Sequence, residues 1–369
     1  MPAITAESRI LDLRPQIVRE KLGSKSKVCL LSSRDIFSVI RDVPVVIMAC
    51  NIRIRHVIPG IMKAAKELDA VVAFELAKTE GGLDGGYTGM TPEIFFDTVV
   101  GYAEERGFTK PFFIHADHLT VKNKSQEEFD STLQLIEAQI KAGYTSFALD
   151  GSFNEVKDNI EITSRLAYKI LPYGYGLETE VGEITHAGQK AEITTVEEAV
   201  EFIEGLISAG VKPDVLGINN GSKHGNYLPG EEANVDLKRT DEIYQAIKKF
   251  QVNIAQHGTT GTPLEVIKKM PDLGIRKANV GTEWQNIAHK YLPQDLFSEM
   301  QKWASENKKD IKFATKVFKK EIDNIDKKSK ETIEQKAYEQ ASILLNAFRA
   351  GKSAEMVLYK LTENQRFAQ

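Results

Sequence analysis

The stretch that decides the fold is an apolar run that ends in titratable side chains, Phe112-Phe113-Ile114-His115-Ala116-Asp117-His118. Its apolar start is typical of a buried β-strand. Two imidazoles and a carboxylate at the end of such a strand need polar partners, because burying them unpaired costs free energy. A neutral imidazole is a common metal ligand, and a carboxylate beside it can move a proton at a bound substrate. The alternative is a capped strand end with hydrogen-bonded polar residues, and the stretch alone does not decide between the two.

Apolar strand patterns alternate with helical patterns on both sides of this stretch. The predicted strands are residues 43–49, 71–74, 112–115, 144–149, 176–180, 215–218, 252–255 and 275–280. The predicted helices that follow them are residues 57–68, 92–106, 127–142, 154–171, 195–209, 241–249 and 263–270. Such alternation implies an α/β fold with parallel strands joined by right-handed crossovers.

A polar residue stands at or just after the end of each predicted strand: Asn51, Glu75, Asp117 with His118, Asp150, Glu180, His224, His257 and Asn279. Eight strands can close into a barrel, in which the carboxyl ends of the strands carry the chemistry. The strand count also fits a doubly wound open sheet, but the repeated polar residue favours the barrel. We therefore predict a (β/α)8 TIM barrel with N-terminal helices within residues 8–40. Residues 1–289 form the predicted barrel domain, and the charged residues 290–369 a helical extension packed on the barrel or on a partner subunit.

The composition is that of an ordinary globular protein. The 369 residues are 42% hydrophobic and 27% charged, with a formal net charge of −4, which gives no reason to expect nucleic acid or an anionic membrane as a partner. No apolar run approaches the roughly 20 residues that span a bilayer, and the first residues lack a signal-peptide pattern. The two cysteines form neither a disulfide framework nor a CxxC motif, so we expect a cytoplasmic protein.

Three of the seven histidines follow predicted strands, namely His118, His224 and His257. A closed barrel would bring them to one mouth, and three neutral imidazoles leave a tetrahedral zinc ion one open position, as in catalytic sites. His224 and His257 are each followed by Gly, which lets backbone N–H groups approach an anion. The loops after strands seven and eight, where barrels of this kind commonly bind phosphate, contain Thr259, Thr260 and Asn279-Val280-Gly281-Thr282.

Together these motifs resemble the class II, metal-dependent ketose-bisphosphate aldolases, typified by fructose-1,6-bisphosphate aldolase. The matching residues run in family order over roughly residues 44–285 and include Asp117-His118, Asp150-Gly151-Ser152, Glu178-Thr179-Glu180-Val181-Gly182, Gly221-Ser222-Lys223-His224-Gly225-Asn226-Tyr227, His257-Gly258 and Asn279-Val280-Gly281-Thr282-Glu283. The Asp-His motif and the two His-Gly motifs are specific in combination, whereas each one alone is weak.

The resemblance implies reversible cleavage of a phosphorylated ketose to dihydroxyacetone phosphate and an aldehyde, glyceraldehyde 3-phosphate, through a metal-stabilised enediolate. The first candidate substrate is fructose-1,6-bisphosphate. The resemblance also implies Zn²⁺ as the cofactor, a monovalent cation near the phosphate, a homodimer or higher homo-oligomer, and a place in glycolysis or gluconeogenesis. The implied metal ligands are His118, His224, His257 and Glu180, and the implied catalytic residues are Asp117, Glu183 and Asn279. The implied substrate and phosphate contacts are Asn51, Gly225, Gly258, Thr259, Thr260, Gly281 and Thr282.

Two loops depart from the family pattern. The family commonly carries an acidic pair after strand five, and residues 183–192 have none in that place. Either Glu183, His186 or Glu192 moves the proton at the dihydroxyacetone carbon, or the loop is only a lid. The serine that often follows strand two is absent. Glu75 stands in that region and would repel phosphate unless a cation such as Lys78 pairs with it.

For several residues the sequence allows two interpretations. Arg53 and Arg55 meet a second phosphate or pair with acidic neighbours, and His115 packs beside the site or ligates the metal. Residues 87–92 resemble a segment of the non-catalytic companion subunit of tagatose-bisphosphate aldolases, or are a glycine turn before a capped helix. Lys277, at predicted strand eight, is a candidate for a Schiff-base mechanism, but the three histidines disfavour it. Three alternatives remain for the whole protein. It is an aldolase for tagatose-1,6-bisphosphate or another phosphorylated ketose, a non-catalytic barrel that supports a partner aldolase, or an enzyme with metal-dependent chemistry on a different small anion.

Overall fold

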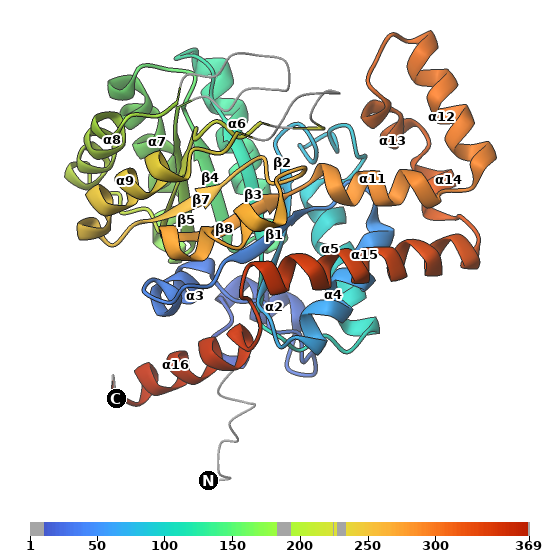
Figure 1. Ribbon diagram of the computed structural model, residues 1–369, viewed down its shortest axis with the longest axis horizontal. Coiled ribbons are helices and arrows are strands. Elements are labelled where there is room, and N and C mark those ends of the chain that lie inside the picture. The colour runs from blue at the N-terminus through green and yellow to red at the C-terminus, as the bar shows by residue number, and fades with distance from the viewer. Residues whose placement is uncertain (1–10, 183–192, 224, 227–233, 368–369) are drawn as a thin grey trace.

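The computed structural model describes residues 11–182, 193–223, 225–226 and 234–367. Its centre is a closed barrel of eight parallel strands in chain order (Figure 1). The strands are β1 (Ile47–Asn51), β2 (Val72–Ala77), β3 (Phe112–Thr120), β4 (Ser146–Asp150), β5 (Gly176–Val181), β6 (Val215–Ile218), β7 (Asn253–Gln256) and β8 (Ile275–Val280). Because β8 pairs in parallel with β1, the predicted TIM barrel is confirmed and the open sheet is excluded.

Helices follow the strands around the outside of the barrel. They are α4 (Ile58–Glu67), α5 (Pro92–Glu105), α6 (Gln126–Ala142), α7 (Val156–Ile170), α8 (Val196–Ser208), α9 (Leu237–Ile247), α10 (Leu264–Ile267) and α11 (Thr282–Tyr291). Local sequence sets their ends: Thr195 and Glu198 form a capping box at the start of α8, and Gly143 ends α6 in a left-handed conformation. In the part of the chain that the structure describes, no helix is both long and apolar enough to cross a membrane.

The segment ahead of β1 covers the amino-terminal end of the barrel. It contains α2 (Gln16–Leu22) and α3 (Ser33–Ile40), in agreement with the predicted N-terminal helices. Between them the chain pairs with the start of the sheet, where Phe112 N donates to Cys29 O at 3.0 Å and Leu31 N to Phe112 O at 2.9 Å. The first residue of β3 is therefore anchored at the end of the barrel opposite the predicted site.

The C-terminal extension runs along the side of the barrel (Figure 1). It comprises α12 (Gln294–Glu306), the 3-10 turn η5 (Ile311–Phe313), α13 (Ala314–Val317), α14 (Lys319–Asp323), α15 (Lys327–Ala347) and α16 (Ser353–Phe367). α15 packs along α4, where Gly60 lies so close to the backbone of α15 that a Cβ would overlap it. α16 reaches α3, because Lys360 Nζ donates to Val39 O at 2.9 Å. The extension thus spans from the loops at the carboxyl ends of the strands to the covered amino-terminal end.

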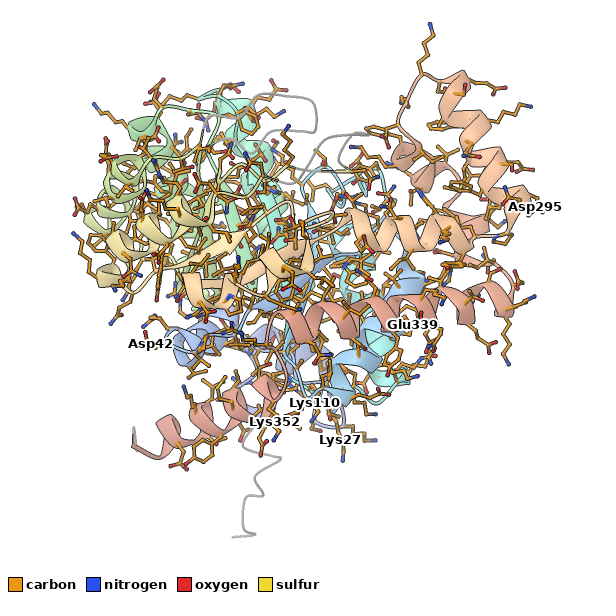
Figure 2. All side chains as sticks on the ribbon, in the orientation of Figure 1. Lys27, Asp42, Lys110, Asp295, Glu339 and Lys352 are labelled. Atoms are coloured by element: carbon orange, nitrogen blue, oxygen red, sulfur yellow. The ribbon has the colours of Figure 1, made fainter. Side chains whose placement is uncertain are left out.

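The described residues after 290 form helices and turns without strands, as predicted. Charged side chains such as Asp295 and Lys352 are exposed and point away from the ribbon (Figure 2). The division of the chain at residue 289 falls within α11 and stays a prediction.

Candidate active site

The strand that carries the His-x-Asp-His motif is longer than predicted and irregular. β3 runs through the motif to Thr120. Its pairing with β4 shifts register between Ala116 and Leu119, and His118 has a positive φ of 42°. Neighbouring residues of a regular strand face opposite sides of the sheet. The bulge turns His118 so that it lines the same pocket as Asp117, which regular pairing would prevent.

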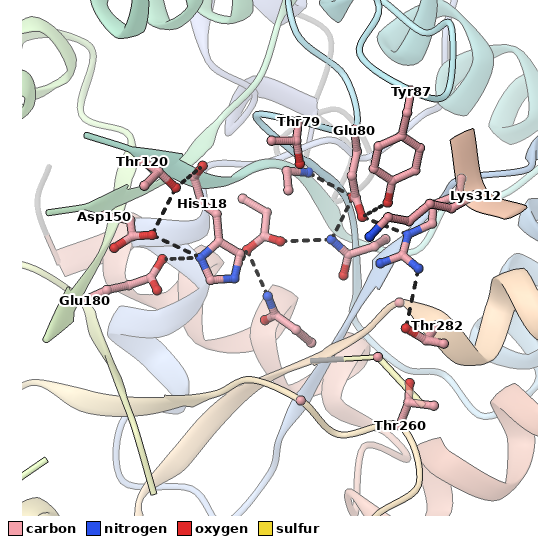
Figure 3. A pocket seen from close by; sticks show the side chains of 18 of the residues that line it. Thr79, Glu80, Tyr87, His118, Thr120, Asp150, Glu180, Thr260, Thr282 and Lys312 are labelled. Atoms are coloured by element: carbon pink, nitrogen blue, oxygen red, sulfur yellow. Dashed lines mark hydrogen bonds and ion pairs between the residues drawn. The ribbon is translucent and has the colours of Figure 1, made fainter. Parts of the chain in front are cut away.

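A pocket of about 230 Å³ opens at the carboxyl ends of the strands (Figure 3). The predicted site residues that line it are Asn51, Asp117, His118, Glu180, Gly225, Gly258, Thr259, Thr260, Asn279, Gly281 and Thr282. In Figure 3, His118, Asp150 and Glu180 gather on one side and Glu80, Tyr87 and Lys312 on the other. The predicted residues Glu183 and His224, with His186 and Glu192, lie outside the described residues.

His118 and His257 face each other. His118 Nε2 lies 2.9 Å from His257 Nδ1. A carboxylate holds the other nitrogen of each ring: Glu180 Oε1 is 3.0 Å from His118 Nδ1, and Glu178 Oε1 is 2.6 Å from His257 Nε2. Two nitrogens that bind one zinc ion at roughly 2.0–2.1 Å lie about 3.3 Å apart, and ligating imidazoles usually carry such a carboxylate behind them. The facing nitrogens therefore fit a shared metal ion.

Acidic groups crowd around this pair. Candidate ligand atoms of Asp117, His118 and His257 lie within 4.8 Å of one another, as do those of His118, Asp150 and Glu180. Burial lowers the pKa of His118, but Asp117 and Glu180 outweigh it and raise that pKa well above its ordinary value. Burial, with Asp150 beside it, raises the pKa of Glu180 to about 7. An excess of carboxylates over cations at buried positions fits a divalent ion.

Asp117 is fixed from both sides. One oxygen accepts from Asn51 Nδ2 at 2.9 Å and the other from Asn279 Nδ2 at 2.9 Å. Burial raises the pKa of Asp117, but the neighbouring His118 and Lys277 outweigh it and hold the pKa well below its ordinary value. The carboxylate is therefore ionised and oriented, and it can accept a proton from a substrate hydroxyl.

Beneath the pocket, Lys277 is completely buried between two carboxylates. Its Nζ lies 2.8 Å from Glu178 and 3.1 Å from Glu75, and donates to Asn279 Oδ1 at 2.6 Å. Burial lowers the pKa of Lys277, but Glu178 and Glu75 outweigh it and raise the pKa above its ordinary value. A protonated ammonium is no nucleophile, so the geometry disfavours the Schiff-base alternative. It also shows that Glu75 pairs with Lys277, while Lys78 donates to a backbone carbonyl of β3.

His115 supports this buried network. Its Nδ1 lies 2.6 Å from Ser146 Oγ and its Nε2 3.4 Å from Glu178. Burial lowers the pKa of His115 to about 4, so the ring is neutral. His115 thereby helps to hold Glu178, the carboxylate that in turn holds His257.

The loops after β7 and β8 form the predicted phosphate side of the pocket. Gly258 has a φ of +65°, and a Cβ there would lie 2.5 Å from Lys223 O, so a larger residue would displace the backbone. Thr259 Oγ1 is buried without a hydrogen-bond partner among the described residues. A hydroxyl next to a glycine, whose backbone other groups can approach closely, is a suitable binding site for an anion.

The pocket wall beside these loops contains residues that belong to none of the aldolase motifs in the sequence. Arg53 Nε lies 2.7 Å from Glu80 Oε1, which also accepts from Tyr87 Oη at 2.8 Å. Burial raises the pKa of Glu80, but Arg53 outweighs it and lowers the pKa below its ordinary value. Arg53 thus pairs with an acidic neighbour and still lines the pocket, whereas Arg55 does not line it.

Comparison with known families agrees with this geometry. The family model described as fructose-bisphosphate aldolase class-II matches residues 32–340. The chain belongs to this family. The predicted resemblance is confirmed, and so is the prediction that the protein is an aldolase, a carbon–carbon lyase. The family is generally metal-dependent, in keeping with the donor atoms around His118 and His257.

Curated relatives and solved structures of aldolases resemble this family member at modest identity. The fructose-bisphosphate aldolase of Streptococcus pneumoniae is 29% identical over 230 residues, which are 61% of this chain and 70% of the relative. The probable fructose-bisphosphate aldolase of Bacillus subtilis is 29% identical over 251 residues, 64% of this chain and 76% of the relative. The crystal structure of the YdjI aldolase from Escherichia coli K12 superposes with a TM-score of 0.63 at 22% identity, covering 88% of this chain and 99% of that one. At that identity the likeness supports the fold.

Glu80, Tyr87 and Lys312 are among the pocket residues of this aldolase that lie outside its predicted site set. Tyr87 lies in the segment that resembles the companion subunit, and Thr91 in that segment does cap α5. Glu80 could have been suspected as an acidic residue in the glycine-rich loop after a strand. Lys312 comes from the extension, where the sequence shows a charged helical pattern and nothing that points to a site.

Proposed function

We propose that the protein is a zinc-dependent aldolase that reversibly cleaves fructose-1,6-bisphosphate to dihydroxyacetone phosphate and glyceraldehyde 3-phosphate. The observation that carries the proposal is the pair of facing nitrogens of His118 and His257, 2.9 Å apart beside Asp117, in a class II family member. The donor set of imidazole and carboxylate suits zinc, and His224 is the predicted third imidazole. A zinc ion held there supplies Lewis acidity for the negative charge that develops on the substrate carbonyl oxygen.

The protein's own groups move the protons and hold the substrate. Asp117 takes the proton from the hydroxyl on the carbon that becomes the aldehyde, and returns it in the condensation direction. Asn51 and Asn279 hold Asp117 at 2.9 Å each, so its position is set before the substrate arrives. Acid–base catalysis of this kind contributes ~10²–10⁴-fold. The second proton, at the dihydroxyacetone carbon, is assigned to Glu183 as a prediction from the sequence.

The phosphate of the dihydroxyacetone half is held by the loops that carry Gly225, Gly258, Thr259, Thr260, Gly281 and Thr282, with a monovalent cation beside it. Binding energy at this group fixes the reacting carbons against the metal side of the pocket. The names of the relatives support fructose-1,6-bisphosphate as the substrate. We further propose a cytoplasmic homodimer that acts in carbohydrate metabolism.

The test is a coupled assay for dihydroxyacetone phosphate with fructose-1,6-bisphosphate, tagatose-1,6-bisphosphate and fructose 1-phosphate, each with and without a chelator. Cleavage of fructose-1,6-bisphosphate that the chelator abolishes, and that His257→Ala loses, supports the proposal. The matched control is His56→Ala, because His56 is a buried histidine whose Nε2 lies 2.7 Å from Ile322 O, away from the pocket. Preference for tagatose-1,6-bisphosphate would change the substrate. No cleavage together with no bound zinc would favour the non-catalytic barrel.

A further inference from the structure

The extension delivers one cation into the pocket. Lys312 lies in η5, and the Asp310 side chain caps that turn by accepting from the Lys312 backbone N–H at 2.9 Å. Lys312 lines the pocket, on the same side as Tyr87 (Figure 3). Its Nζ lies 5.7 Å from the Tyr87 ring centroid and 5.5 Å from that of Phe313, within the range of cation–π attraction. The two rings contact each other at 5.5 Å, so they hold the ammonium at the pocket wall.

This cation lies beside a second one that already has a partner. Arg53 is held by Glu80 at 2.7 Å and donates through Nη1 to Gln285 Oε1 at 2.6 Å and to Thr282 Oγ1 at 3.4 Å. Its Nη2 lies 3.3 Å from the position that a Cβ on Gly281 would occupy. The guanidinium therefore borders the loop after β8, on which the proposed phosphate contacts lie.

The two cations of this wall differ in their partners. Glu80 compensates Arg53, and the structure shows no carboxylate within 4.0 Å of Lys312 Nζ among the residues it describes. Thr259 Oγ1, on the neighbouring loop, also lacks a hydrogen-bond partner among those residues. An ammonium and a buried hydroxyl that face one pocket fit a phosphate group.

We propose that Lys312 is a substrate-binding residue that balances the charge of the phosphate on the dihydroxyacetone half, with Arg53 as its fixed neighbour. The helical extension then completes the substrate site of the barrel. The assignment of that phosphate to a ketose rests on the proposed function, whereas the anion site itself does not.

The test measures binding of inorganic phosphate to the metal-loaded full-length protein by isothermal titration calorimetry at constant ionic strength. Lys312→Met keeps an aliphatic stem beside the two rings and removes the charge, so we expect a ~10-fold higher Kd. Lys312→Arg restores the charge and should stay within about threefold of the wild type. Arg53 is unsuitable for this test, because its removal would leave Glu80 buried without its cation.

The matched control is Lys316→Met in α13. Its ammonium donates to Asp84 O at 2.9 Å outside the pocket, so the variant has the same charge change on the same segment. We expect its phosphate Kd to equal that of the wild type. In the cleavage assay Lys312→Met should raise KM for the phosphorylated ketose ~10-fold with kcat within about threefold.

The inference is overturned if phosphate does not bind the wild type, if Lys312→Met binds it within twofold of the wild type, or if Lys316→Met loses as much. A failure of the proposed function appears differently. The wild type would then cleave no phosphorylated ketose, while phosphate binding would still depend on Lys312.

Discussion

Replacing Lys277 by Met would leave two buried carboxylates without their cation. Glu75 is 0% and Glu178 1% exposed, and their oxygens lie 3.1 and 2.8 Å from Lys277 Nζ. Breaking a buried ion pair by removing one partner costs about 3–5 kcal/mol. Met has nearly the length of Lys, so a cavity adds little to this loss. We expect the free energy of unfolding of Lys277→Met to fall by about 3–5 kcal/mol at pH 8.

The loss of unfolding free energy in Lys277→Met should increase with pH. Burial holds the pKa of Glu75 well above its ordinary value, whereas at Glu178 burial is outweighed by Lys277 and the neighbouring histidines, which hold the pKa well below it. Lys277 is the largest influence opposing burial at each carboxyl. Without Lys277, the pKa values of both carboxyls rise relative to the wild type, and that of Glu75 lies still further above the unfolded value of about 4.3. A carboxyl whose pKa is raised on folding contributes its stability below the unfolded pKa and loses it as the pH rises through the folded pKa. The deficit of the variant relative to the wild type should therefore be smallest near pH 5 and grow towards pH 8.

The assay is urea unfolding at pH 5 and pH 8 in the presence of EDTA, so that bound metal does not contribute. Lys63→Met is the surface control and should change the unfolding free energy by less than about 0.5 kcal/mol. Adding Glu178→Gln to Lys277→Met should recover part of the loss at pH 8. A loss below about 1 kcal/mol at pH 8, or an equal loss at both pH values, would refute the argument.

Three further changes test other parts of the site and the fold. Gly258→Ala places a Cβ 2.5 Å from Lys223 O at a φ of +65°, so KM for the phosphorylated ketose should rise and the melting temperature should fall; unchanged steady-state kinetics would contradict this. Asp117→Asn keeps the shape and removes the proton acceptor, so kcat should fall ~10²–10⁴-fold in the coupled assay, and a loss under tenfold would count against the assigned role. Burial lowers the pKa of His289 to about 4, so the unfolded chain binds more protons between about pH 4 and 6.5 and stability is lost on acidification. His289→Leu should reduce the loss measured between pH 7.5 and pH 5 by about 2 kcal/mol, and an unchanged pH dependence would reject that reasoning.

The barrel could be predicted because its pattern is local and repeated. Each strand is a short apolar run that ends near a polar residue, and helices separate the strands. Closing the barrel therefore brings the strand ends together, independently of the loop sequences. Asp117 and Asn279, taken from strands three and eight, do meet at 2.9 Å in the structure. The strand bounds were less predictable, since β3 continues through the motif to Thr120.

The backbone bulge at His118 gave no signal in the sequence. The φ of 42° at His118 results from how β3 pairs with β4. That pairing is a property of two strands and cannot be read from one stretch of sequence. The partner of Glu75 depended in the same way on distant chain segments. Lys78 is near in sequence, but β8 delivers Lys277 to 3.1 Å inside the barrel.

Lys312 could not be predicted for a related reason. Its place in the pocket depends on the path of the extension, to which the packing of α15 on α4 contributes. A charged helical pattern predicts exposed side chains, and most of the lysines in the extension are indeed at the surface. Lys312 lines the pocket, where its ammonium lies beside the rings of Tyr87 and Phe313.

The central claim is that the facing histidines hold the metal on which aldol cleavage depends. The most direct measurement strips the protein of metal and titrates zinc back while following cleavage of fructose-1,6-bisphosphate. Activity should be absent in the stripped protein, rise linearly and reach its plateau at one zinc per chain, and His257→Ala should show no rise over the same range. Full cleavage by the stripped protein, or equal recovery in His257→Ala, would contradict the claim.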